Sequence, residues 1–251
     1  MSPPAVHLQH VSFTYPNGQH ALRDVSFEVK KGESVAVIGG NGAGKSTLLL
    51  HLNGFLTAHH GTVHIGGIPV APGNLVAVRQ AVGMVFQNPD DQLFMPTVFD
   101  DVAFGPNNMK LPSAEVQQRV RAALDTVGAA HLSARLPHQL SSGEKRAVAI
   151  AGVLAMAPSV LVMDEPSDGL DPAARRRMIN LLRGFEHSMI VATHDLDLVL
   201  DVCSRVLVLH AGHIEADGPP PVIFSDRELL LRCSLEQPLS WQSRNVPDFN
   251  A

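Results

Sequence analysis

The sequence has little cysteine and no long apolar run, and each absence excludes a class of protein. Its 251 residues include only two cysteines, Cys203 and Cys233, which are too few for a disulfide framework. Nothing at the N-terminus resembles a secretory signal, and no apolar stretch approaches the roughly 20 residues that a membrane-spanning helix needs. We therefore expect a cytosolic chain that folds alone and reaches a membrane only through a partner.

The chain also lacks an excess of positive charge. Its formal net charge is -5 and its isoelectric point is about 6.2, which argues against a nucleic acid held on a broad basic surface. The only dense basic run, Arg175–Arg177, lies in an expected helix and is typical of a solvated helix face. No nucleic-acid partner is therefore expected.

Thirteen histidines raise the question of a metal site. The densest group consists of His51, His59, His60 and His64. No carboxylate or cysteine accompanies these residues at a spacing that would converge on one ion, so scattered surface histidines are the favoured interpretation.

The most informative stretch is a glycine-rich loop that fits the pattern G-x-x-x-x-G-K-[ST]. It follows the apolar run Ser34–Ile38, which is typical of a buried parallel strand, and it leads into an expected helix. Loop N–H groups and a helix N-terminus in this arrangement form a nest for phosphate oxygens. The residues expected to bind nucleotide are Gly39, Gly40, Asn41, Gly42, Ala43, Gly44, Lys45, Ser46 and Thr47.

Two side chains of this loop have separate expected tasks. Lys45 would reach the β- and γ-phosphates, and the Ser46 hydroxyl would hold a magnesium ion. The structural alternative is a glycine-rich turn before an ordinary helix. Because strand, loop, Lys-Ser-Thr and helix follow one another in register, we favour a site for a nucleoside triphosphate with Mg²⁺.

A second pattern places two acids directly after a buried strand. The run Val160–Met163 is apolar, and Asp164 and Glu165 follow it, which predicts that both lie at the carboxyl edge of a parallel sheet beside the phosphate loop. Asp164 is expected to hold the magnesium shell through water, and Glu165 to polarise an attacking water. Alone, the pair would indicate a strand-end turn, but its combination with the phosphate loop favours catalysis.

A serine-rich turn precedes another expected helix. Leu140–Lys145 reads Leu-Ser-Ser-Gly-Glu-Lys and leads into an apolar helix at 146–155. Serine and glycine there are typical of an N-cap, but free N–H groups and a hydroxyl also suit a γ-phosphate. The residues expected to contact nucleotide in this segment are Ser141, Ser142, Gly143 and Glu144.

The apolar pattern along the chain predicts an α/β protein. Alternation over Val6–Phe13 and Ala21–Val29 predicts antiparallel strands, and the region from about 98 to 156 is mainly helical. Apolar runs separated by helices predict a parallel sheet. These runs are 34–38, 82–86, 160–163, 189–192 and 206–209, with a β segment at 61–65, a hairpin at 210–213 and, after prolines at 219–221, a short helix around 226–232.

In this order, over about residues 5–225, the motifs resemble those of the ATPase subunits of ATP-binding-cassette (ABC) transporters. The resemblance implies a P-loop NTPase fold with a mixed RecA-like sheet core, an antiparallel β subdomain and a helical subdomain at about 88–157. Together these would form one nucleotide-binding domain over residues 1–232. The tail 233–251 has no clear period and stays unassigned.

The resemblance also implies roles for further residues. Tyr15 matches an aromatic residue that stacks on adenine, although a turn tyrosine beside a proline is the alternative. Gln87 matches a glutamine that contacts magnesium and the hydrolytic water, and His194 matches a histidine that hydrogen-bonds the γ-phosphate. The segment Ser167–Asp171 matches a loop that crosses the dimer interface in such ATPases. By this match, Asp171, the last residue of the segment, is counted among the expected nucleotide-binding residues.

In this family each ATP lies between the phosphate loop of one subunit and the 140–144 segment, the signature, of another. One copy of each motif therefore implies a homodimer with two equivalent sites. Further implied partners are an integral membrane coupling subunit and a substrate-binding membrane subunit, with this chain peripheral on the cytoplasmic face of the membrane. ATP would close the dimer and hydrolysis would open it.

The segment 86–106 and the signature are both similar to those of energy-coupling-factor (ECF) importers. The segment 86–106 is most like that of the cobalt and nickel systems, and we favour cobalt as the transported ion. Alternatives are an ECF vitamin importer, another ABC transporter including an exporter, a soluble ABC ATPase of DNA repair or translation, and a small nucleotide kinase. The chain shows neither the coiled-coil insertion of repair members nor the paired cassettes of translation members, which disfavours the soluble class.

Two positions depart from the commonest signature, which has glycine and glutamine where this chain has Ser142 and Glu144. A carboxylate close to a triphosphate is electrostatically unfavourable. It stays unfavourable there unless Lys145 or Arg146 offsets its charge.

Overall fold

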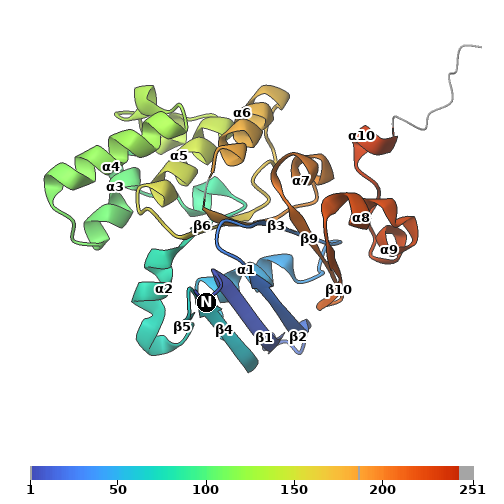
Figure 1. Ribbon diagram of the computed structural model, residues 1–251. Coiled ribbons are helices and arrows are strands. Elements are labelled where there is room, and N and C mark those ends of the chain that lie inside the picture. Colours follow the sequence, from blue (N-terminus) through green and yellow to red (C-terminus); the bar gives the residue numbers. More distant parts are fainter. Residues whose placement is uncertain (1, 186, 243–251) are drawn as a thin grey trace, which may run out of the picture.

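Two sheets and a lobe of helices make up the protein (Figure 1). The computed structural model describes residues 2–185 and 187–242. In this part of the chain, no helix is long and apolar enough to cross a bilayer.

The first sheet is antiparallel, with the strand order β2-β1-β4-β5. The predicted antiparallel strands are confirmed as β1 (Val6–Thr14) and β2 (His20–Val29), and all their buried side chains are apolar. The predicted strict alternation is broken in β1, where His10 is exposed and Val11 buried, because the pairing register shifts between Leu8 and Val11. Strand β4 (His60–Ile65) pairs with the other edge of β1. Strand β5 (Ile68–Pro69) was not predicted, since two residues are too short to show a period.

The second sheet is mixed, with the order β10-β9-β3-β8-β7-β6. Its neighbours are parallel except β9 and β10, which form the predicted hairpin. Both faces of the parallel part are covered, which explains its continuous apolar runs. The strands are β3 (Ser34–Ile38), β6 (Val82–Val85), β7 (Val160–Asp164), β8 (Ser188–Ala192), β9 (Arg205–His210) and β10 (His213–Gly218).

Helices cover the mixed sheet on both sides. Helix α1 (Lys45–Leu52) lies between the two sheets, and its leucines share one core with strands of both (Figure 1). The opposite face packs against a group of helices near the end of the chain. These are α6 (Pro172–Arg183), α7 (Leu196–Val202), α8 (Pro220–Ser225) and α9 (Arg227–Arg232).

A lobe of three helices projects from the side of the sheets (Figure 1). It consists of α3 (Val98–Asn108), α4 (Ser113–Thr126) and α5 (Ser142–Leu154), which enclose a core of their own. Helix α5 also contributes Ile150 and Val153 to the core under the mixed sheet, so it links the lobe mechanically to the sheet. Short 3-10 helices lie at Pro72–Asn74, Pro89–Asp91, Ala130–Leu132 and Pro137–Gln139.

Three helices were not predicted from the sequence. Helix α2 (Leu75–Ala81) buries only Val78, so its apolar period is too weak to recognise. Helix α8 begins among the prolines at 219–221, which we expected to precede a helix and not to lie inside one; proline at the first helical positions suits the helix backbone. Helix α10 (Leu239–Gln242) lies in the tail left unassigned, of which residues 243–251 fall outside the described residues.

The strand order brings the predicted chemical residues to one edge of the mixed sheet. Because β3, β8, β7 and β6 are parallel neighbours, their carboxyl ends lie side by side. The phosphate loop follows β3, while Asp164 ends β7 and Glu165 comes next. His194 follows β8 and Gln87 follows β6, so four strands each deliver a candidate group to the same edge.

Candidate active site

The phosphate loop needs glycine at two positions for different reasons. A Cβ atom on Gly39 would lie 2.1 Å from the backbone oxygen of Leu209 on the neighbouring strand. Gly44 has a φ of 108° and lies against the Ala21 backbone, where a Cβ would come within 2.4 Å of an oxygen. Only glycine allows both the close approach and the left-handed turn that starts α1.

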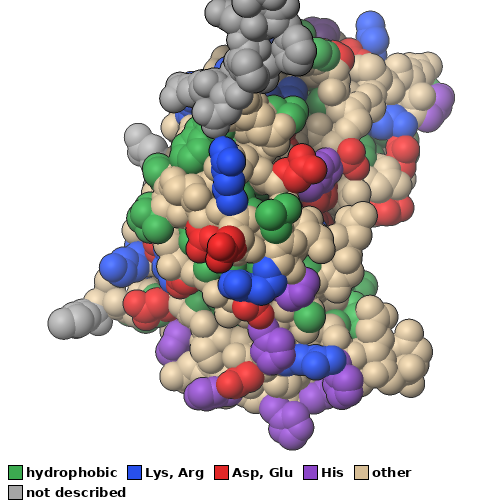
Figure 2. Space-filling view, turned by 90° about the vertical axis from the view of Figure 1, so that its right-hand side faces the viewer, with side chains coloured by type: hydrophobic (Ala, Val, Ile, Leu, Met, Phe, Trp, Pro, Cys, Tyr) green, Lys and Arg blue, Asp and Glu red, His purple; other side chains and the backbone are tan. Residues whose placement is uncertain are grey.

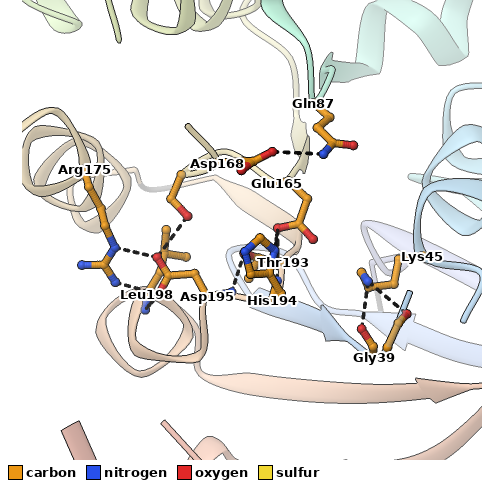
Figure 3. Close-up of polar contacts among 12 residues, drawn as sticks. Gly39, Lys45, Gln87, Glu165, Asp168, Arg175, Thr193, His194, Asp195 and Leu198 are labelled. Carbon is orange, nitrogen blue, oxygen red and sulfur yellow. Dashed lines mark hydrogen bonds and ion pairs between the residues drawn. The ribbon is translucent and has the colours of Figure 1, made fainter. Parts of the chain in front are cut away.

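The start of α1 is left open for an anion. Its N-cap residue, Gly44, has no side chain to occupy the first N–H groups, and no acidic residue lies in the first turn. Lys45 is buried, and its Nζ donates to the carbonyl oxygen of Gly39 at 2.8 Å (Figure 3). The ammonium group is therefore held over the loop by the loop itself, where it can exchange carbonyl oxygens for phosphate oxygens.

Other loop residues are placed around this centre. Tyr15 is half-buried, and its hydroxyl lies 3.0 Å from Oγ1 of Thr47, while its ring meets Phe13 edge to face at 5.0 Å. The phenol ring is therefore fixed next to the loop. Ala43 is buried, whereas Asn41 and Gly42 are exposed.

Asp164 has the features of a ligand for a hard cation. It is 6% exposed, it hydrogen-bonds the Ser46 side chain, and its Oδ1 has no hydrogen-bond partner among the residues that the structure describes. Burial raises the pKa of Asp164, while the Ser46 hydrogen bond and the charge of Lys45 act in the opposite direction. A hydroxyl and a carboxylate oxygen without a partner fit the oxygen coordination of Mg²⁺.

Glu165 is held against His194. It is 7% exposed and has a positive φ of 46°, a conformation that non-glycine residues adopt rarely and only where the surrounding structure holds it. Its N–H donates to the Ala192 carbonyl of β8 at 2.8 Å. Its Oε2 accepts the backbone N–H of His194 at 3.1 Å and lies 2.9 Å from the ring Nδ1 of His194 (Figure 3). The carboxylate and imidazole therefore form one unit at the sheet edge.

A half-buried ion pair holds Asp195, the residue that follows His194. Arg175 donates to both carboxylate oxygens of Asp195 at 2.6 and 2.7 Å, and Ser167 Oγ donates to Asp195 at 3.0 Å. Burial alone would raise the pKa of Asp195, but these donors and the N–H of Leu198 outweigh it and lower the pKa. The expectation that Arg175 lies on a solvated face was wrong, because α6 turns this side chain toward α7.

Gln87 and the loop after Glu165 are also joined. Nε2 of Gln87 donates to Oδ2 of Asp168 at 3.1 Å (Figure 3). Arg146 of α5 is 3% exposed, and it donates to the carbonyl oxygens of Phe86 at 2.9 Å and Asp168 at 3.3 Å. The bridge that Arg146 forms between these two carbonyl groups was not predicted from the sequence. A cation at the start of an otherwise apolar helix was the available indication that the residue would be buried and hydrogen-bonded.

The signature segment begins α5 with a capping box. Oγ of Ser141 accepts the N–H of Glu144, and Oε2 of Glu144 accepts both the N–H and the hydroxyl of Ser141 at 2.8 Å. These hydrogen bonds lower the pKa of Glu144, and the bond from the backbone N–H of Ser141 has the largest effect. Neither neighbouring cation forms an ion pair with Glu144 among the described residues, since Lys145 pairs with Asp90 and Arg146 turns to the carbonyls described above.

The remaining predicted nucleotide contacts lie near helix starts. Ser142 is exposed at the first position of α5, and Gly143 packs close to Ala174 of α6. Asp171 is the N-cap of α6, where it accepts the N–H groups of Ala173 and Ala174 at 2.9 Å. No hydrogen bond or ion pair within the part of the chain that the structure describes joins the signature to the phosphate loop.

Histidines gather away from this edge. Figure 2 shows many histidine side chains on the lower part of one face, at the level of the antiparallel sheet. His10 pairs with Asp24 at 2.7 Å. Within residues 2–185 and 187–242, no group of three or more His, Cys, Asp or Glu side chains is arranged to hold a metal ion. His51 was wrongly expected at the surface; it is fully buried on α1 and faces Phe13.

Comparison with known proteins identifies the family. The sequence profile described as "ABC transporter" matches residues 22–168, more than half of the chain. The chain belongs to the ABC transporter family. It is 57% identical to a protein of Geobacter sulfurreducens provisionally named an ABC transporter ATP-binding protein, over 96% of this chain and 97% of that protein. It is 48% identical to the energy-coupling factor transporter ATP-binding protein EcfA of Methanothermobacter thermautotrophicus, over 93% and 76% of the two chains.

Solved structures agree with this ABC assignment. CbiO1 of Clostridium perfringens, described as part of the ABC transporter complex CbiONQ, superimposes with a TM-score of 0.82 at 37% identity, over 97% of this chain and 99% of that one. An ATP-binding cassette solved as a dimer with ADP and phosphate has a TM-score of 0.77 at 27% identity, over 86% and 98%. The predicted P-loop fold is confirmed, and the protein is an ABC transporter ATPase that binds ATP with Mg²⁺.

Proposed function

We propose that this ATPase powers an ECF-type importer of a divalent transition-metal ion, with cobalt as the first candidate and nickel as the second. The likeness to EcfA and CbiO1 supports the ECF class. The observation that carries the proposal is the segment 86–106, which resembles the cobalt and nickel systems and forms an exposed aromatic groove on the helical lobe. The transported metal binds a membrane subunit and does not touch this chain.

The groove suits a helix of a membrane coupling subunit. Phe94 and Phe104 are 63% and 42% exposed and meet edge to face at 4.9 Å, beside a cavity of about 180 Å³. Asp101 lines this cavity and is buried. Its Oδ1 accepts the N–H groups of Phe94 and Met95, whereas its Oδ2 has no partner in the described ranges. A docked helix would cover the rings and offer a hydrogen-bond donor to Asp101.

At the sheet edge, the residues have the following proposed tasks. Ser46, Asp164 and Gln87 would hold Mg²⁺, which offsets the phosphate charge when it is bound with ATP. Lys45 binds the β- and γ-phosphates, and Tyr15 stacks on adenine. Glu165 orients the attacking water and accepts its proton, while His194 donates a hydrogen bond to the γ-phosphate. The short contact between Glu165 and His194 supports these paired tasks.

A second copy of the chain would complete each site. Among the described residues, the signature forms no hydrogen bond or ion pair with its own phosphate loop. Ser141 and Gly143 lie at a helix start, where they could bind the γ-phosphate held by the other copy. Closure on ATP and opening after hydrolysis would move the helical lobe about Gln87 and pull on the docked helix. The dimer would lie at the cytoplasmic face of the membrane.

Reconstitution tests this proposal. The ATPase, a membrane coupling subunit and a substrate-binding membrane subunit are placed together in liposomes, and uptake is measured with cobalt, nickel or a vitamin. ATP-dependent cobalt uptake supports the proposal, and vitamin uptake without metal uptake favours an ECF vitamin importer. Failure to co-purify with any membrane protein after detergent extraction would favour a soluble ABC ATPase.

A further inference from the structure

Asp168 holds the side chain of Gln87 by its amide nitrogen. The two residues are 81 positions apart in the chain, and they meet where the loop after β6 passes the loop after Glu165, with Nε2 of Gln87 3.1 Å from Oδ2 of Asp168. Both side chains are exposed. The hydrogen bond therefore has to be supported by the backbone around it if it is to persist in water.

A buried guanidinium supplies that support. Arg146, 3% exposed, donates to the carbonyl of Phe86, which directly precedes Gln87, and to the carbonyl of Asp168 itself. One rigid group of α5 thus fixes the distance between the two loops. The two loops are bridged twice, by Arg146 through their backbones and by the Gln87–Asp168 hydrogen bond through their side chains.

The Gln87–Asp168 hydrogen bond selects one orientation of the Gln87 carboxamide. An ionised carboxylate only accepts hydrogen bonds, so Asp168 must face the NH₂ end of Gln87. Figure 3 shows the amide nitrogen turned toward Asp168 and the amide oxygen turned away from it. A magnesium ion and the hydrogen atoms of a water both require the oxygen of an amide, and the flipped amide would present N–H groups that a cation repels.

We infer that Asp168 is a positioning residue, which keeps the amide oxygen of Gln87 directed to the magnesium nucleotide site. The inference rests on the proposed role of Gln87. It gives Asp168 a task within its own subunit, in addition to the location of its loop at the dimer interface. Without Asp168, Gln87 would stay in place through Arg146 but would lose its fixed orientation.

The test compares full-length wild type with Asp168→Ala, Gln87→Ala and the double variant. The first measurement uses protein free of metal and nucleotide: the NMR signals of the Gln87 side-chain NH₂ group, assigned by their loss in Gln87→Ala. In Asp168→Ala these signals are expected to move toward those of a solvated amide. The second measurement is the Mg²⁺ concentration for half-maximal ATPase activity. It should rise about fivefold in Asp168→Ala, the factor that about 1 kcal/mol from one hydrogen bond provides.

Two comparisons separate positioning from a general structural effect. Asp168→Ala should add nothing to the Mg²⁺ requirement in the Gln87→Ala background, because the carboxylate acts through that amide. Asp168→Asn, which can still accept through its amide oxygen, should restore part of the wild-type requirement. Glu115→Ala removes a carboxylate that is likewise hydrogen-bonded to a side chain, Arg119, but lies on helix α4 of the lobe, and it should leave the requirement unchanged.

The outcomes distinguish this inference from the proposed function. Unchanged Gln87 signals in Asp168→Ala, or an equal effect with and without Gln87, would overturn the inference alone. An Mg²⁺ requirement that rises in Gln87→Ala but not in Asp168→Ala would do the same. If Gln87→Ala itself leaves the requirement unchanged, the proposed role of Gln87 is wrong and the inference falls with it.

Discussion

Arg175 binds both carboxylate oxygens of Asp195, the residue that directly follows His194. Asp195 also caps α7 through the N–H of Leu198 and accepts the hydroxyl of Ser167. The backbone of His194 is thus held on one side by Glu165 and on the other by a residue that Arg175 immobilises. Arg175 would therefore act on the site through Asp195.

Replacing Arg175 by methionine should therefore slow hydrolysis without weakening ATP binding. We expect kcat to fall about tenfold, because about 1.4 kcal/mol of a charge-assisted bidentate hydrogen bond would be lost from the positioning of His194. Steady-state ATPase kinetics measure kcat and KM separately. Arg176→Met is the matched control, since Arg176 is mostly exposed and lies 4.0 Å from its nearest acid. Equal losses in both variants would contradict the prediction.

The contact between Glu165 and His194 leads to a prediction for catalysis. Glu165→Gln keeps the size of the side chain but removes the carboxylate that accepts a proton from water, so turnover should fall by at least about 100-fold. ATP-dependent dimerisation should remain, because the phosphate loop is intact. Phosphate release and sedimentation with Mg-ATP measure the two properties. Hydrolysis near the wild-type rate would remove Glu165 from its proposed role.

The separation of signature and phosphate loop within one chain predicts complementation between two defective copies. Ser141→Arg should block hydrolysis while the variant monomer still binds ATP, and Lys45→Ala should lose ATP binding. A mixture of the two variants should recover part of the activity, since one composite site in each mixed dimer combines an intact loop with an intact signature. ATPase assays over a range of mixing ratios test this. If no ratio recovers activity, the shared-site arrangement is refuted.

The capping box predicts that Glu144 limits dimer closure. Its carboxylate occupies the N–H and hydroxyl of Ser141, the donors proposed for the γ-phosphate of the other copy, and adds a negative charge there. Glutamine also serves in a capping box, so Glu144→Gln should keep the helix start but lose the charge. In a Glu165→Gln background, the ATP-dependent dimer should dissociate at about fivefold lower concentration, which corresponds to about 1 kcal/mol. A weaker dimer would contradict this interpretation, and Glu115→Gln is the surface control.

His51 predicts a pH dependence of stability. Burial is the main cause that lowers the pKa of His51 in the folded protein, so the unfolded chain binds a proton more readily. The free energy of unfolding should therefore fall as the pH drops below about 6.5, the ordinary histidine pKa, until the lowered pKa is reached. His51→Leu should remove up to about 1 kcal/mol of the change measured by urea unfolding between pH 7.5 and pH 5.5. The control is His213→Leu, which replaces an exposed histidine and should leave this change as it is in the wild type. An unaltered pH dependence in His51→Leu would refute the prediction.

Much of the site could be predicted because it is encoded locally. The glycine spacing at 39–44, the apolar strand before it and the acids that follow Val160–Met163 are properties of neighbouring residues. Their backbone conformation is set within a few positions by steric limits and by hydrophobic periodicity. The P-loop, the parallel strands and the positions of Asp164, Glu165 and His194 at strand ends were therefore accessible from the sequence.

The partners of side chains were decided by tertiary structure. Whether Arg175 is solvated depends on how α6 packs on α7, and whether Arg146 meets Glu144 or two distant carbonyls depends on how α5 crosses the sheet edge. Sequence patterns specify which residues are apolar and where an element begins, but they do not specify the direction of a polar side chain relative to elements many positions away. Burial then selects the partner, because a charged group removed from water must find donors or acceptors wherever the fold supplies them.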